Sequence, residues 1–189
     1  MLGRVASFFA FVVCLAGFSS AASAQAVVHA LTGTVNSIDP AAKTITMFLD
    51  NGKQDTFKDM TNSKVSFSAD RKMLASTTTP DDLKKQGAYV VVFYFGGSED
   101  RTAVALRGLG AGPFTATTGI VTKFDPHRSL TVQDNSGAMQ TFTLAADTIT
   151  ESGAGAQSAL KFQADKGGKV RIVGASKDGS PIALFVSAN

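Results

Sequence analysis

The 189-residue sequence has no tryptophan, one cysteine and two histidines, and these shortages exclude several classes of function. A single cysteine forms no internal disulfide, and a cysteine-based zinc site needs several thiolates. Acid–base catalysis near neutral pH relies most often on histidine, and neither His29 nor His127 has the surroundings of a catalytic base. The net charge of +3 comes from dispersed basic residues, unlike the clustered footprint of a nucleic-acid binder. We therefore predict neither an enzyme nor a nucleic-acid-binding protein.

The beginning of the chain has the features of a secretory signal peptide. A basic start is followed by the almost wholly apolar run 5–18, and cleavage after Ala24 or after Ala26 fits the small-x-small rule. The run is shorter than the roughly 20 residues of a membrane span. Cys14 lacks the preceding small residue that lipoprotein processing requires. We predict a signal peptide over 1–24 and a periplasmic or secreted protein that loses its only cysteine on export.

What the sequence does contain is an internal repeat. Residues 32–40 (TGTVNSIDP) return as residues 118–126 (TGIVTKFDP). In both copies a strand pattern ends in an Asp-Pro turn, because Asp bonds its own downstream backbone and Pro presets φ. The stretch 109–115, rich in glycine with a proline, separates the copies as a linker. The repeat predicts two β modules, at 27–108 and 116–189.

Each copy carries the strand and turn signals of a small β-barrel. In the first copy, strands are expected at 31–38, 43–49, 53–57, 87–95 and 103–106. A proline and acidic residues after Thr79 predict a short helix over 79–85, with a weaker counterpart at 156–162. Five strands with a helix between the third and fourth follow the order of an OB-type barrel. The fold prediction is all-β, with two tandem five-stranded OB-like barrels and at most one short helix in each.

Several residues recur at matching places in the two copies. In the first copy they are Gly33, Val35, Ile38, Asp39, Thr44 to Thr46, Asp82, Leu83 and Val90 to Val92. In the second copy they are Gly119, Val121, Phe124, Asp125, Leu130 to Val132, Leu160 and Val170. This pattern resembles a bacterial exported family of unknown function whose members carry small β modules, often in tandem. The resemblance covers nearly all of the chain after the signal peptide, and it implies fold and export without an active site.

A fold-level resemblance also links the chain to the periplasmic copper and silver efflux chaperones, which are exported small barrels of OB type. Their metal site uses a histidine, a tryptophan and a closely spaced pair of methionines. This chain has no tryptophan, and Met47, Met60, Met73 and Met139 stand alone. The chaperones' metal site therefore does not carry over, and we predict no cofactor.

The apolar strand of the first copy holds the candidate ligand-binding residues. Tyr89, Phe93 and Phe95 share one face of this strand, where exposed rings would form a stacking platform for a ligand. A strand so continuously apolar is more often buried on both faces, so the core interpretation is preferred. The matching strand of the second copy carries Lys169 and Arg171 instead, so at most one copy would keep such a platform.

His29 is the candidate metal ligand. Cleavage after Ala26 would leave Val27-Val28-His29 as the N-terminus, with an amine, two amide nitrogens and an imidazole. Such a nitrogen set suits the square-planar preference of Cu(II) and Ni(II). Cleavage after Ala24, which is the preferred site, would place Gln25 first and destroy the arrangement.

The leading hypothesis is an exported, non-catalytic binding module of the bacterial cell envelope. Its partner would be an unidentified protein, polymer or small ligand, bound through loops or the groove between the barrels. The alternative is a periplasmic metal-handling protein that uses the His29 tail. The recurring Asp39 and Asp125 are interpreted as turn caps rather than as an acid–base pair. Function is expected where the copies differ, in the 68–78 loop, the 89–95 strand and this tail.

Overall fold

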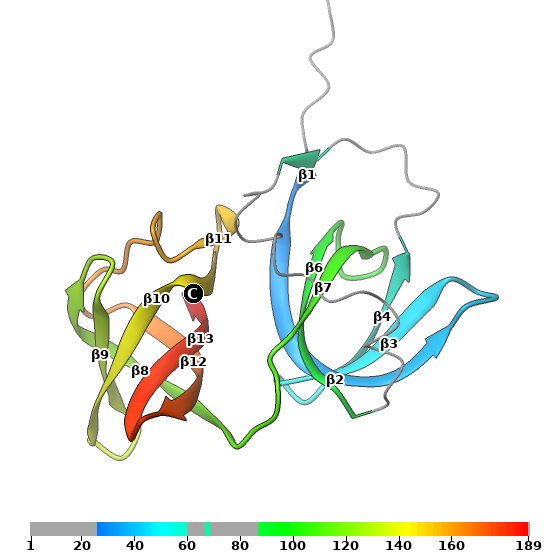
Figure 1. The fold of residues 1–189 in the computed structure, drawn as a ribbon. Coiled ribbons are helices and arrows are strands. Elements are labelled where there is room, and N and C mark those ends of the chain that lie inside the picture. Colours follow the sequence, from blue (N-terminus) through cyan, green and yellow to red (C-terminus); the bar gives the residue numbers. More distant parts are fainter. Residues whose placement is uncertain (1–25, 60–66, 69–86, 189) are drawn as a thin grey trace, which may run out of the picture.

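The computed structural model describes residues 26–59, 67–68 and 87–188, which form β-strands and the turns between them (Figure 1). These ranges contain no helix, and therefore no helix in them is long and apolar enough to cross a membrane. The predicted signal peptide, the predicted helix at 79–85 and nearly all of the 68–78 loop lie outside the described residues. The all-β prediction is confirmed.

Five strands of the first module close into a barrel. They are β2 (His29–Asp39), β3 (Thr44–Leu49), β4 (Gln54–Asp59), β6 (Tyr89–Phe95) and β7 (Thr102–Gly108). Their order is β2-β3-β4-β7-β6, and only β4 and β7 pair in parallel. The Asp39 carboxylate accepts hydrogen bonds from the backbone N–H groups of Ala41 and Ala42, as a turn cap should. A short parallel pair, β1 (Ala26–Val27) with β5 (Phe67–Ser68), lies beside the barrel.

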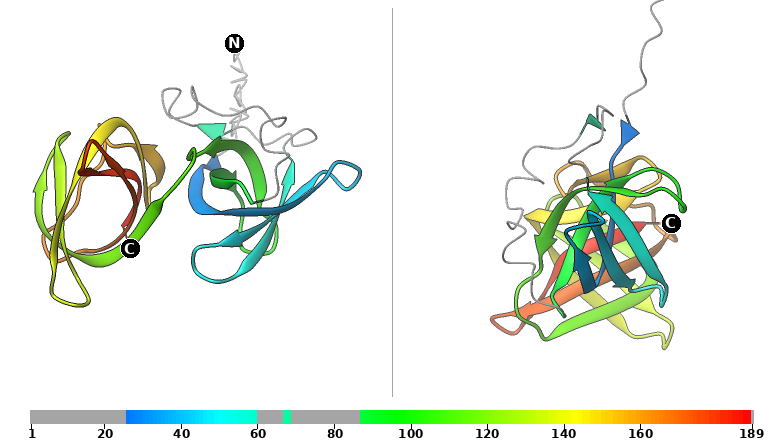
Figure 2. Two further views of the ribbon diagram at one scale, coloured as in Figure 1. Left: turned by 60° about the horizontal axis from the view of Figure 1, so that its bottom comes forward. Right: turned by 90° about the vertical axis from the view of Figure 1, so that its right-hand side faces the viewer.

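The second module repeats this arrangement. Its strands are β8 (Phe114–Asp125), β9 (Ser129–Asp134), β10 (Met139–Ser152), β12 (Lys169–Lys177) and β13 (Ser180–Ala188). They form a ring in the order β8-β9-β10-β13-β12, again with the third and fifth strands parallel. The short β11 (Gly155–Ser158) pairs with the far end of β10. Figure 2 shows the two modules side by side, and the prediction of two tandem five-stranded OB-like modules is confirmed.

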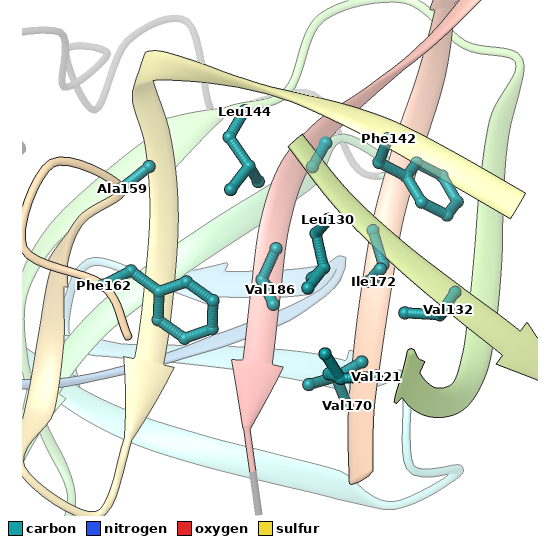
Figure 3. Close-up of a cluster of buried hydrophobic side chains, with 11 residues drawn as sticks. Val121, Leu130, Val132, Phe142, Leu144, Ala159, Phe162, Val170, Ile172 and Val186 are labelled. Carbon is teal, nitrogen blue, oxygen red and sulfur yellow. The ribbon is translucent and has the colours of Figure 1, made fainter. Parts of the chain in front are cut away.

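Alternate side chains of the strands fill the interior of each module. The second interior contains Val121, Leu130, Val132, Phe142, Leu144, Ala159, Phe162, Val170, Ile172, Ala183 and Val186 (Figure 3). The first contains Val35, Met47, Leu49, Phe57, Val90, Val92, Tyr94, Ala103 and Leu106. Phe57 and Phe142 occupy equivalent places on the third strands, and both are fully buried. Each module therefore has its own apolar core, which a small domain without disulfides requires.

The glycines that recur in the repeat are needed for close strand packing. A Cβ on Gly33 would lie 2.4 Å from the carbonyl oxygen of Phe48, and one on Gly119 would lie 2.4 Å from that of Gln133. In each module the register between the first and second strands shifts just after this glycine. Glycine and a β-bulge together permit the sharp bend of a strand in a small barrel. The repeat thus preserves a curved strand pair.

Two expectations from the sequence are wrong. His29 does not lie in a tail before the first strand, because it begins β2 and pairs with Tyr94. The weak helix signal at 156–162 corresponds to part of β11 and the turn that follows it. The N–H of Ala156 donates to the carbonyl oxygen of Val28 at 2.7 Å, so pairing with the first module overrides a weak local preference.

Candidate functional site

The two modules share an apolar interface, which we call the seam. Its buried members are Val28, Ala30, Val91 and Phe93 from the first module and Ile149, Val173 and Phe185 from the second. All of them are at most 2% exposed. Along β6, Val90 and Val92 point into the barrel, whereas Val91 and Phe93 point into the seam. Burial on both faces explains why this strand is almost continuously apolar.

The seam uses matching surfaces of the two copies. In the first module β6 and β7 pair Phe93 with Ala105, and in the second β12 and β13 pair Val173 with Phe185. All four side chains pack in the seam, so equivalent positions of the repeat meet there. An interface that uses the same patch on both partners is the arrangement of a twofold dimer. The chain is therefore organised as a pseudo-dimer of its own repeat.

Two polar bridges flank the apolar contact. His29 Nδ1 lies 2.7 Å from Glu151 Oε1, and the N–H of Ala30 donates to Glu151 Oε2 at 2.8 Å. Burial raises the pKa of the Glu151 carboxyl, and the hydrogen bonds from His29 and Ala30 act in the opposite direction. Arg107 of β7 donates to the carbonyl oxygen of Asp147 at 2.8 Å and to its carboxylate at 3.0 Å. Both bridges join the first module to β10.

A third polar contact, which we call the Asp50 group, consists of Asp50, Thr32, Tyr89 and Arg171. Arg171 of β12 donates to Asp50 Oδ2 at 2.5 Å and to Thr32 Oγ1 at 3.0 Å. The Tyr89 hydroxyl donates to the same carboxylate oxygen at 2.5 Å, and the Thr32 hydroxyl also donates to it. Burial, together with the hydrogen bond and negative charge of Asp50, raises the pKa of Tyr89 to about 12. The second module thus places a guanidinium in a polar site of the first.

The predicted stacking residues lie at or near this interface. Phe93 is fully buried in the seam, and Phe95 is 7% exposed. Tyr89 is partly buried, and its ring lies 5.0 Å, centroid to centroid, from the ring of Phe114. In this arrangement Phe93 and Phe95 present no open face to a base or sugar. Where a ligand is expected between the modules, the described side chains pack against one another in the seam.

The predicted metal ligand also faces the second module. A square-planar site would need His29 Nδ1 and neighbouring backbone nitrogens to converge on one ion. In the structure this nitrogen faces Glu151, and His29 is extended within β2, where successive N–H groups point in opposite directions. No cluster of three or more potential metal-binding side chains occurs among the described residues. Metal handling through the tail stays a prediction that would require this end of β2 to rearrange.

Sequence reasoning missed the partners that hold the seam together. No local signal near Asp50 or Glu151 points to these partners, because each contacts a residue far away in the chain. The available signal was a difference between the copies, because Arg171 stands where the first module has Val91. Asp50 likewise corresponds to Asn135 in the second module. Each member of this ion pair has an uncharged counterpart in the other copy, so the equivalent contact on the other side of the pseudo-dimer has no ion pair.

An open depression lies on the surface of the second module. Its lining residues are Ala116, Thr117, Thr118, Asp134, Asn135 and Ser136. Asp134 accepts hydrogen bonds from the Ser136 hydroxyl and from the backbone N–H groups of Ser136 and Ala138. The bond from the Ser136 hydroxyl is the main cause that lowers the pKa of Asp134. The depression therefore carries a carboxylate that is ionised at neutral pH.

No family model matches the chain, and no curated protein matches it. The resemblance to a bacterial exported family therefore rests on the recurring residues of the two copies alone. The structure establishes the architecture, two OB-like modules joined by a seam.

Proposed function

We propose that the protein is an exported, non-catalytic binding module of the bacterial cell envelope that engages a protein partner. The observation that carries this proposal is the outer face formed by the second and third strands of each module. OB-type barrels commonly use this face for ligands. In the first module the face presents Thr46, Phe48, Gln54 and Thr56, and in the second Thr131, Gln133, Met139 and Thr141.

The two outer faces carry similar side chains, with the glutamine and the large apolar residue on exchanged strands. Each has a pair of cross-strand threonines in hydroxyl contact, at 3.1 Å in the first module and 2.9 Å in the second. Next to this pair, a glutamine lies opposite a large apolar side chain, Phe48 in one module and Met139 in the other. These two side chains are 50% and 57% exposed. An apolar anchor surrounded by polar groups is typical of surfaces that bind proteins.

A protein partner is favoured over a small ligand because of how the modules meet. Small-ligand sites are usually concave, enclosed and mostly apolar. Among the described residues, the side chains between the modules pack in the seam cluster, and the depression on the second module is open and lined mostly by polar residues. The other candidate surfaces in the described part of the chain are sheet faces, which suit a broad contact.

Export and the absence of catalysis are proposed on separate grounds. The features of a signal peptide at 1–24 support a periplasmic or secreted location. The ionisable groups brought together at the seam, His29 with Glu151 and Asp50 with Arg171, bind each other across the modules. This pairing supports a structural role for them.

Site-specific photo-crosslinking in the periplasm of a bacterial host tests the proposal. Crosslinkers at Phe48 and Met139 should yield adducts with one and the same protein, whereas a crosslinker at Lys177, the last residue of β12, should not. With the partner identified, the double substitution Phe48→Ser and Met139→Ser should weaken binding at least roughly tenfold, since both apolar anchors are lost. Retention of the protein in the cytoplasm, or equal adducts from Lys177, would refute the proposal.

A further inference from the structure

The depression of the second module occupies the place that the Asp50 group occupies in the first. Gly33 of β2 pairs with Leu49, and its repeat partner Gly119 of β8 pairs with Asp134, so the turns that follow these strands correspond. The corresponding residues are Thr32 and Thr118, Asp50 and Asn135, and Asn51 and Ser136. One of the two sites is filled and the other is open.

The difference between the sites lies in the group that enters them. Thr32 pairs with Val91 in the first module, and Thr118 pairs with Arg171 in the second, so Val91 and Arg171 are repeat partners. Arg171 reaches across the seam into the first site. The repeat partner that would reach the second site is Val91, which is buried in the seam and has no hydrogen-bond donor in its side chain. Accordingly Thr32 is 3% exposed, whereas Thr118 is exposed.

We propose that the open site of the second module binds a guanidinium group, supplied by an arginine side chain of the protein partner. The lining supplies the acceptors that such a group needs, namely the Asp134 carboxylate, the Asn135 amide oxygen and the Thr118 hydroxyl. Ile120 and Met139 lie on the strands that border the site, and they are 45% and 57% exposed. They offer apolar surface to the aliphatic stem of an arginine.

The site should hold arginine better than lysine, and only weakly as an isolated contact. A planar fork of donors matches two acceptors at once, whereas an ammonium is a point charge. Lys169 stands where the first module has Tyr89, and its positive charge reduces the attraction for a second cation. A dissociation constant weaker than about 1 mM is expected for a single exposed pair of this kind. The larger affinity of the partner would come from the outer face.

Nuclear magnetic resonance titration with a blocked tripeptide, acetyl-Gly-Arg-Gly-amide, tests the site on the intact exported chain. The backbone N–H signals of residues 134–136 should shift, and the citrulline analogue, which has the same shape without the charge, should leave them unchanged. The variant Asn135→Asp restores the carboxylate that Asp50 supplies in the first module, and it should bind roughly tenfold more tightly. Lys169→Ala should also strengthen binding.

Equal shifts with the citrulline peptide, or unchanged affinity in Asn135→Asp, would overturn the inference. Asn135 and Lys169 are exposed, so both variants should fold normally. Thermal unfolding of each variant checks this and separates a loss of binding from misfolding. The inference rests on the proposed function, yet the two fail separately. Crosslinking to a partner without arginine binding refutes only the guanidinium site, whereas arginine binding without any crosslinked partner refutes the proposed function of the outer face.

Discussion

Replacement of Phe93 by alanine tests whether the seam makes the two modules one folding unit. Phe93 is fully buried among side chains of both modules. Its neighbours Val92 and Tyr94 point into the barrel instead. The substitution therefore removes contacts between the modules and leaves the interior of the first barrel unchanged.

The expected magnitude follows from the buried area. A buried phenylalanine removes on the order of 200 Å² from water, which corresponds to about 5 kcal/mol at roughly 25 cal/mol per Å². Measured Phe→Ala substitutions in protein cores cost roughly 3–5 kcal/mol. Because alanine keeps the Cβ, we expect a loss of about 4 kcal/mol in the free energy of unfolding. Phe48→Ala is the matched control, since Phe48 is 50% exposed and should cost less than about 1 kcal/mol.

Calorimetry and denaturant unfolding provide the assay. The unaltered chain should unfold in one cooperative transition, because its modules share a buried cluster. The Phe93→Ala chain should unfold earlier and separate into two transitions as the modules lose their coupling. Two well-separated transitions in the unaltered chain, or a Phe93→Ala loss no larger than that of Phe48→Ala, would refute the reasoning.

Three further predictions concern single groups. Tyr89 should ionise near pH 12 in an ultraviolet titration, and Asp50→Asn should lower this pKa because a neighbouring negative charge is lost. Since the folded pKa is raised from 10.0 to about 12, the stability that Tyr89 contributes is present below pH 10 and lost as the pH rises through 12. Glu151, whose pKa burial raises, should show a carboxyl carbon titration midpoint above that of ordinary glutamates, and a midpoint below them would contradict the buried bridge. Gly119→Ala, whose Cβ would lie 2.4 Å from a carbonyl oxygen, should cost on the order of 2 kcal/mol in thermal unfolding, whereas Gly153→Ala meets nothing within 4 Å and should be near neutral.

The order of strands within each module could be predicted because its signals are local. Asp39 caps its turn through its own downstream N–H groups, and Gly52 takes a φ of 79° in the Asn-Gly turn. Both effects depend on a few consecutive residues. The repeat then allowed the same order to be assigned to the second module, including its shorter Asp125 turn.

The seam could not be predicted, because its contacts are not encoded locally. The pattern of β6 shows a strand that is apolar on both faces, but it does not indicate what covers the face that points away from the barrel interior. Arg171 marks a difference between the copies, yet its partner Asp50 is 121 residues away. Similarly, nothing near His29 points to Glu151. Only the placement of the two modules brings these pairs together.

The long separation of the seam contacts has a consequence for how the chain is made. His29 and Glu151 are 122 residues apart, and Thr32 and Arg171 are 139 apart. At a synthesis rate of roughly 5–20 residues per second, on the order of ten seconds pass between the synthesis of the first strand and that of its partners. During this interval Val91 and Phe93, the side chains of β6 that face the seam, are not covered by the second module. A chain that stalls before β10 and β12 therefore exposes an apolar strand to proteases and chaperones, and formation of the seam depends on completed synthesis.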